Sequence, residues 1–204
     1  MNNDNMKTIV ADITTIKVDA IVNAANKELL GGSGIDGAIH AAAGPELKEY
    51  CRRFNGCHTG EARITPGFNL PAKYIIHAVG PRYYKSRNPK AKLINCYKNS
   101  MMLAYENDIH TIVFPSISTG IFHYPKEEAI PIAVSTIDSM IEYLKKEKNY
   151  DINVIFCLAD RHTELMYKLA IYMNELYKED SLNGQTNEPD NASDSHPQKG
   201  NEDD

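Results

Sequence analysis

The sequence of 204 residues lacks the features that mark membrane, secreted and zinc-binding chains. No stretch approaches 18 consecutive apolar residues, and the N-terminus has no basic segment followed by an apolar run. Four cysteines are present, with no CxxC pair and no histidine at zinc-finger spacing. They are Cys51, Cys57, Cys96 and Cys157. We therefore expect free thiols, no metal site, no membrane association and a cytoplasmic protein.

An excess of positive charge is also missing. The chain has 22 Lys and Arg against 27 Asp and Glu, which gives a formal net charge of −5. Residues 181–204 hold six acidic residues and one lysine, so the first 180 residues are balanced. Because affinity for a phosphate backbone needs clustered Lys and Arg, this balance argues against general nucleic-acid binding.

Residues 181–204 have little with which to form a core. Leu182 is their only large apolar residue, and no periodicity is present. Such a composition is typical of disorder. We therefore predict one folded domain over residues 1–180 and a disordered acidic tail over residues 181–204.

Short apolar runs alternate with longer amphipathic segments along residues 1–180, which indicates strands and crossover helices. The predicted strands are 7–11, 20–23, 62–65, 74–79, 111–115 and 153–158. The predicted helices are 36–43, 46–53, 91–107, 126–146 and 164–177. This alternation predicts an α/β fold with three layers, α/β/α, around a mostly parallel sheet.

A glycine-rich segment follows the second predicted strand. NAAN (residues 23–26) is followed by LLGGSGIDGAIH (residues 29–40). Three glycines in four residues allow close approach of a ligand, and the next helix offers free N–H groups to an anion. The segment favours phosphate binding. A flexible loop before a helix capped by Asp36 is the alternative.

The segment VFPSISTGIF (residues 113–122) follows the fifth predicted strand. It gathers hydroxyl and backbone N–H groups without a lysine, which suits a diphosphate bound by neutral donors. A Ser/Thr turn with a helix cap is the alternative. No Walker A lysine follows either glycine cluster, so a nucleoside triphosphate is not expected.

Five segments together resemble the macrodomain family in order and spacing. They are ADIT (11–14), VDAIVNAAN (18–26), GGSGIDGAIH (31–40), HAVGP (77–81) and PSISTGIF (115–122), the last before a Tyr-Pro pair. From about residue 7 to 177 the chain is similar to the MacroD-type branch, which contains ADP-ribosyl hydrolases and O-acetyl-ADP-ribose deacetylases. The resemblance implies a three-layer α/β/α macrodomain with a central mixed, mostly parallel sheet.

The resemblance also implies roles for residues of an ADP-ribose pocket. Asp12 would accept a hydrogen bond from the adenine amino group, and the Ile13 backbone N–H would contact the ring. Asn26 would hold the distal ribose and Asp36 would orient or deprotonate the attacking water, which makes these two the expected catalytic residues. Further ligand contacts are expected at Asn23, Ala25, Gly32, Ser33, Gly34, Ile35, Gly37, Ser118, Thr119, Gly120, Ile121 and Phe122. Residues 118–121 would bind the diphosphate, and Phe122 would pack against the distal ribose.

The implied function is removal of mono-ADP-ribose from acidic side chains and deacetylation of O-acetyl-ADP-ribose. The ester leaves as a carboxylate, so a positioned water with base assistance suffices. The base is either Asp36 or the substrate's own phosphate. No cofactor is expected. The expected partners are ADP-ribose, O-acetyl-ADP-ribose and mono-ADP-ribosylated proteins.

Four positions depart from the family pattern. Ala11 and Ser33 replace glycines, and His123 stands where the family commonly has glycine. Leu158 stands where many relatives place an aromatic residue against adenine, so adenine selection is expected to rest more on Asp12. We expect His123 to point to solvent, with stabilisation of developing charge as the alternative.

Two further functions remain open at this point. A non-catalytic ADP-ribose reader would use the same pocket, although binding-only relatives commonly lack the acid at the position of Asp36. Bacterial relatives with a regulatory role towards a ribonuclease raise the second possibility, and no sequence feature bears on such a surface. His40 and His77 are expected to be hydrogen-bonded packing residues rather than bases.

Overall fold

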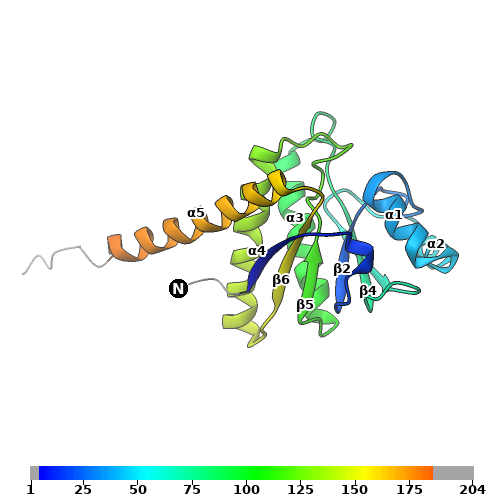
Figure 1. The fold of residues 1–204 in the computed structure, drawn as a ribbon, viewed down its shortest axis with the longest axis horizontal. Coiled ribbons are helices and arrows are strands. Elements are labelled where there is room, and N and C mark those ends of the chain that lie inside the picture. The colour runs from blue at the N-terminus through cyan, green and yellow to red at the C-terminus, as the bar shows by residue number, and fades with distance from the viewer. Residues whose placement is uncertain (1–4, 186–204) are drawn as a thin grey trace, which may run out of the picture.

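The computed structural model describes residues 5–185 and shows six strands in one sheet between two layers of helices (Figure 1). The strands are β1 (Met6–Val10), β2 (Ala20–Ala25), β3 (Ala62–Pro66), β4 (Tyr74–Val79), β5 (Thr111–Phe114) and β6 (Asn153–Leu158). Their order is β1-β6-β5-β2-β4-β3, and β3 pairs antiparallel with β4 while the other pairings are parallel. The predicted three-layer fold with a mixed, mostly parallel sheet is confirmed.

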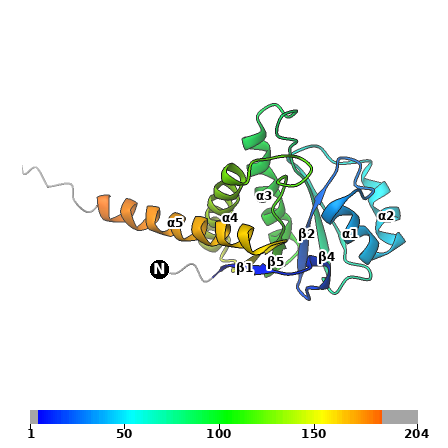
Figure 2. The same cartoon turned by 45° about the horizontal axis from the view of Figure 1, so that its top comes forward.

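Helices cover both faces of the sheet (Figure 2). One face carries α1 (Gly34–Ala43) and α2 (Pro45–Cys51), with the short 3₁₀ helices η1 (Ile13–Thr15) and η2 (Arg52–Phe54). The other face carries α3 (Pro89–Glu106), α4 (Lys126–Lys148) and α5 (Arg161–Gln185). Successive strand residues point to opposite layers, so Ile21 and Ile75 pack under α1 and α2 while Val22 and Ile76 pack under α3 and α4. The protein therefore has two hydrophobic cores, one on each face of the sheet.

The helix ends follow local chemistry. The Asn88 side chain accepts from the Ala91 N–H, so α3 begins at Pro89, two residues before the predicted start. Glu127 and Glu128 lie in the first turn of α4, where the helix dipole favours negative charge.

The closing helix is longer than predicted. α5 runs from Arg161 to Gln185, so residues 181–185 of the predicted tail continue it. Residues 186–204 lie outside the described residues, and the disordered acidic tail stays a prediction. Within residues 5–185, every helix is too short or too polar to span a membrane.

The sheet order creates a crevice between β2 and β5. These strands are parallel neighbours, but β2 leads to α1 on one face and β5 leads to α4 on the other. The loops leaving their carboxyl ends therefore separate to opposite faces. Ligands bind at such a switch point in open α/β sheets.

At the other end of β2, the Asp19 side chain forms hydrogen bonds to the segments that lead into β4 and β5. Its carboxylate accepts a hydrogen bond from Lys73 Nζ at 2.7 Å. It also accepts from the backbone N–H groups of His110 at 3.3 Å and Thr111 at 3.1 Å. The hydrogen bond from Lys73 is the largest cause that lowers the pKa of Asp19.

Asp19→Asn should lower the free energy of unfolding at pH 7 by about 1 kcal/mol, the usual net value of a lost hydrogen bond. Because folding lowers the pKa of Asp19, its stabilisation is present above the unfolded pKa and is lost as the pH falls through the folded pKa. Urea unfolding should therefore show a smaller difference from wild type at pH 3 than at pH 7. The exposed Glu106→Gln is the control, and a difference for Asp19→Asn that does not change with pH would contradict this role.

Candidate functional site

A pocket of about 530 Å³ lies at the carboxyl ends of the strands, between the loops that follow β2 and β5. Both predicted catalytic residues, Asn26 and Asp36, line it. The predicted ligand contacts that line it are Ala25, Gly32, Ser33, Gly34, Ile35, Ser118, Thr119, Gly120, Ile121 and Phe122. The fold thus brings the two loops singled out in the sequence to one cavity.

Four predicted contacts lie outside the pocket lining: Asp12, Ile13, Asn23 and Gly37. Asp12 caps η1, where Oδ1 accepts from the Thr14 N–H at 2.9 Å, and its side chain is exposed. It stays close to the pocket, because Cys157 lines the cavity and its thiol donates to Ala11 O at 3.2 Å. Ile13 is buried in the core under α1 and α2.

Gly37 and Asn23 support the wall of the pocket from behind. A Cβ on Gly37 would stand 2.4 Å from Gly32 O, so glycine is required for the first loop to pack on α1. Asn23 is fully buried, and its Nδ2 donates to Asp36 Oδ1 at 2.7 Å.

Several lining residues were not assigned to the site from the sequence. Gly80 and Arg82 follow β4, and Ala159 and Asp160 follow β6. The rule that identified the loops after β2 and β5, ligand binding at the carboxyl ends of parallel strands, also applies to β4 and β6. Applied there, it would have found these residues. Others in the lining are Ala24, Pro115, Ser116, Ile117, Lys126, Cys157, Leu158 and Thr163.

Asp36 is held between two asparagines. It lies in the first turn of α1 and is only 4% exposed. Asn26 Nδ2 donates to Gly31 O at 2.9 Å and lies 3.3 Å from Asp36 Oδ2, while its Oδ1 accepts from the Leu29 N–H at 3.0 Å. The first loop therefore fixes Asn26, and Asn23 and Asn26 together fix the carboxylate.

The environment of Asp36 favours a base. Burial raises its pKa, against the opposing effects of the Asn23 hydrogen bond and of His40, whose Nε2 lies 3.6 Å away. Burial also lowers the pKa of His40, which favours a neutral imidazole. A buried carboxylate with a raised pKa beside a cavity is suited to accept a proton near neutral pH.

The second loop is shaped for close contact with a ligand. Ser118 adopts φ 66, and its buried Oγ has no hydrogen-bond partner within the described chain. A Cβ on Gly80 would lie 2.1 Å from this Oγ, so a glycine is needed beside it. The Arg82 guanidinium lies over the Phe122 ring, with 4.9 Å from Cζ to the ring centroid.

His123 adopts φ 54, a conformation that favours glycine. Its side chain is exposed and does not line the pocket. This orientation agrees with the expectation that His123 points to solvent.

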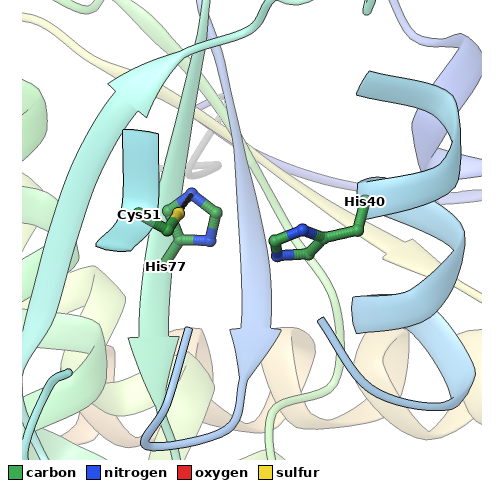
Figure 3. Close-up of side chains that lie close together, drawn as sticks. All are labelled: His40, Cys51 and His77. Atoms are coloured by element: carbon green, nitrogen blue, oxygen red, sulfur yellow. Dashed lines mark hydrogen bonds between the residues drawn. The ribbon is translucent and has the colours of Figure 1, made fainter. Parts of the chain in front are cut away.

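Three potential metal ligands meet beneath the pocket, where the sequence had indicated no cluster. Figure 3 shows His40 from α1 and Cys51 from α2 on either side of His77 from β4. Their ligand atoms lie within 4.8 Å of one another. The three residues lie 11 and 26 positions apart along the chain and on different elements, so they form no spacing motif, which is why the sequence did not reveal them.

The ring nitrogens of His77 are already in use. Nδ1 lies 3.1 Å from Asn23 Nδ2, and Nε2 lies 3.1 Å from Thr65 Oγ1. Burial lowers the pKa of His77 to about 3 and raises that of the Cys51 thiol to about 11. His77 is therefore arranged as a neutral, hydrogen-bonded residue, as expected, whereas His40 Nε2 has no hydrogen-bond partner within the described residues. The absence of a metal site stays a prediction.

A second hollow of about 650 Å³ lies between α3, α4 and α5. Its walls are mostly apolar and include Ile130, Val134, Met166 and Met173. Lys126 lines both hollows, whereas Asp36 lines only the first. The chemistry of the first pocket has no counterpart there.

The family model of the Macro domain matches residues 22–133. The chain belongs to the macrodomain family. It is 49% identical over 168 residues to the macro domain-containing protein RSc0334 of Ralstonia nicotianae, covering 81% of this chain and 94% of that protein. It is also 49% identical over 174 residues to the human ADP-ribose glycohydrolase MACROD2, covering 84% of this chain and 40% of that protein.

Solved macrodomain structures share the fold. The Oceanobacillus iheyensis macrodomain with ADP gives a TM-score of 0.76 at 39% identity, covering 86% of this chain and 95% of that one. The Trypanosoma brucei macrodomain in complex with ADP-ribose gives 0.74 at 37% identity, covering 82% and 69%.

Gly37→Ala should weaken ADP-ribose binding by tenfold or more, because the new methyl group displaces Gly32 and with it the first loop. Titration calorimetry with ADP-ribose measures the loss. Ala42→Gly, at an exposed position of the same helix, destabilises α1 by about 1 kcal/mol without touching the loop. An equal loss of affinity in both variants would show that helix stability, and not loop position, is responsible.

Proposed function

We propose that this macrodomain binds ADP-ribose in the pocket and hydrolyses the ester that joins ADP-ribose to acidic side chains of proteins. The observation that carries the proposal is the Asp36 carboxylate, buried at the pocket wall and held by Asn23 and Asn26. A pocket that only bound ADP-ribose would not need a buried carboxyl group with a raised pKa beside the ligand.

The ligand's parts match the parts of the pocket. Adenine would lie at the β6 end, between Leu158 and the Asp12 carboxylate. The diphosphate would lie between the first loop and residues 118–121, which offer neutral donors beside a helix N-terminus. The distal ribose would then reach Asn26, Asp36 and Phe122. Relatives solved with ADP and with ADP-ribose support this choice of ligand.

The reaction needs a positioned water. Its oxygen attacks the anomeric carbon of the distal ribose, Asp36 takes a proton from it, and the bond to the ester oxygen breaks to release the side-chain carboxylate. Asn23 and Asn26 keep the base in place, which contributes orientation. Because a carboxylate is a good leaving group, no protein nucleophile or metal takes part in the proposed step.

The same site would act on O-acetyl-ADP-ribose. The water attacks the acetyl carbonyl as Asp36 takes its proton, the bond from the acyl carbon to the ribose oxygen breaks, and the ribose oxygen takes up the proton as acetate leaves. Similarity to proteins named ADP-ribose glycohydrolase MACROD2 supports a hydrolase over a reader. The natural partners would be mono-ADP-ribosylated proteins of the cytoplasm.

Asp36→Asn should lower kcat on a glutamate-linked mono-ADP-ribosylated protein by about 100-fold or more, the usual contribution of a general base. The Kd for ADP-ribose should stay within a few fold, because the amide has the shape of the carboxylate. Release of ADP-ribose and calorimetry measure the two quantities. Glu46→Gln makes the same chemical change at an exposed position and should leave both unchanged.

Two other results of the Asp36→Asn experiment would change the proposed mechanism or function. If Asp36→Asn retains full turnover, the substrate's phosphate is the base. If wild type binds ADP-ribose but hydrolyses neither the protein ester nor O-acetyl-ADP-ribose, the protein is a reader and the proposal is wrong.

Asp12→Asn should relax the preference for adenine. Its Oδ1 can still accept from the Thr14 N–H, so η1 keeps its cap, while an amide nitrogen replaces the oxygen that would accept from the adenine amino group. We expect a loss of about tenfold in the ratio of ADP to GDP affinity, in line with one hydrogen bond to a charged group. An unchanged ratio would place adenine elsewhere in the pocket.

A further inference from the structure

A line of buried polar side chains runs from the outer strand β3 to Asp36. Thr65 on β3, His77 on β4 and Asn23 on β2 are each at most 1% exposed. All three point to the layer formed by α1 and α2, since Asn23 pairs with His77 and Thr65 pairs with Ile75 in the sheet. Three neighbouring strands thus lead from the edge of the sheet to the pocket wall.

One direction of hydrogen donation satisfies the contacts along this line and leaves Asn23 Oδ1 without a partner within the described residues. The Thr65 hydroxyl donates to Pro66 O at 3.0 Å and has no second proton, so it accepts from His77 Nε2. A neutral imidazole has one N–H, so His77 Nδ1 must be the acceptor facing Asn23. The Asn23 amide therefore turns its NH₂ group inward, with one hydrogen to His77 and the other to Asp36 Oδ1 at 2.7 Å.

If each donor and acceptor in this line exchanged roles, the Asn23 amide would turn its oxygen, and not its NH₂ group, towards Asp36. If His77 carried its proton on Nδ1, the Asn23 amide would have to present its oxygen to the ring. The hydrogen bond from Asn23 Nδ2 to Asp36 would then be weakened or lost. The state of His77 is thus linked to the hydrogen bonding of a carboxylate that His77 does not touch.

We propose that Thr65 and His77 are positioning residues that fix the orientation of the Asn23 amide and so keep Asp36 in its ionised form. The inference rests on the proposed function, in which Asp36 is the base. It adds two residues that lie outside the pocket lining and act only through Asn23.

The groups around Asp36 give the expected direction of the change. His40 faces it from α1, Asn23 from β2, and Asn26 from the loop directly after β2. Cys51 of α2 and His77 of β4 lie behind, and Lys48 acts on His40. Burial raises the pKa of Asp36, and the Asn23 hydrogen bond is the largest effect that lowers it. Loss of this bond should raise the pKa further, so that more of Asp36 is protonated at neutral pH.

The test compares Thr65→Val with Thr65→Ser. Valine has nearly the shape of threonine but cannot accept from His77, whereas serine keeps the hydroxyl. We expect Thr65→Val to move the acidic limb of the kcat profile to higher pH and to lower kcat about tenfold at pH 7, with recovery at higher pH. The Kd for ADP-ribose should stay within twofold. Thr65→Ser should restore the wild-type profile, which a role in packing alone would not explain.

Two NMR measurements on the ligand-free protein make the test independent of turnover. ¹⁵N spectra should show His77 protonated on Nε2 in wild type and Thr65→Ser, and ¹³C titration of the Asp36 carboxyl should give a higher midpoint in Thr65→Val. Protonation of wild-type His77 on Nδ1 would overturn the proposal, even if Thr65→Val failed to fold. So would an unchanged Asp36 titration in a folded Thr65→Val. If the wild-type protein has no hydrolase activity, the proposed function is wrong. The two NMR measurements still test whether Thr65 and His77 orient Asn23, because they do not depend on turnover.

Discussion

Burial of the Asp36 carboxylate among amide groups is the interaction on which the rest of the site depends. A charge taken out of water is costly unless hydrogen bonds replace its hydration. Asn23 and Asn26 supply those bonds, and both lie on or directly after β2 because the strand end delivers them to the first turn of α1. The same closeness leaves little room for a side chain at Gly32, since a Cβ there would stand 3.0 Å from Asp36 Oδ2 and would displace the carboxylate by a few tenths of an ångström. The glycine-rich loop is thus a requirement of the buried acid as much as of a ligand.

The order of the strands explains how the Asp36 carboxylate and a binding site for a negatively charged diphosphate can share one cavity. The loop after β2 closes over one face and the loop after β5 over the other, so the cavity has two walls of independent sequence. The first loop carries the Asp36 carboxylate, and the second presents the neutral Ser118, Thr119 and Gly120, while Asp160 after β6 is the other acid in the lining. A diphosphate can therefore lie near Asp36 with part of the wall formed by neutral groups.

Much of this arrangement could be predicted from the sequence. Apolar β-branched runs such as YIIHAV identified β4 without error, and glycine, asparagine and serine after strands located both loops. Contacts that cross strands could not be predicted in the same way, because they depend on register. Asn23 was expected at the ligand and lies behind Asp36, and the meeting of His40, Cys51 and His77 depends on three elements. The end of α5 was missed because residues 178–185 have no apolar period that would mark a helix.

The direction of α5 has a consequence for how this domain can be combined with others. Its first turn contributes Thr163 to the pocket, and its next turns pack on the sheet, where Tyr167 contacts Phe156 of β6. The later turns extend away from the sheet in both views (Figures 1 and 2), and the whole helix of 25 residues is about 37 Å long. A fused protein, dye or surface tether placed beyond this helix would stand well away from the bound nucleotide. The fold can accordingly serve as a module in longer polypeptides, as in the human relative of which the matched region is 40%.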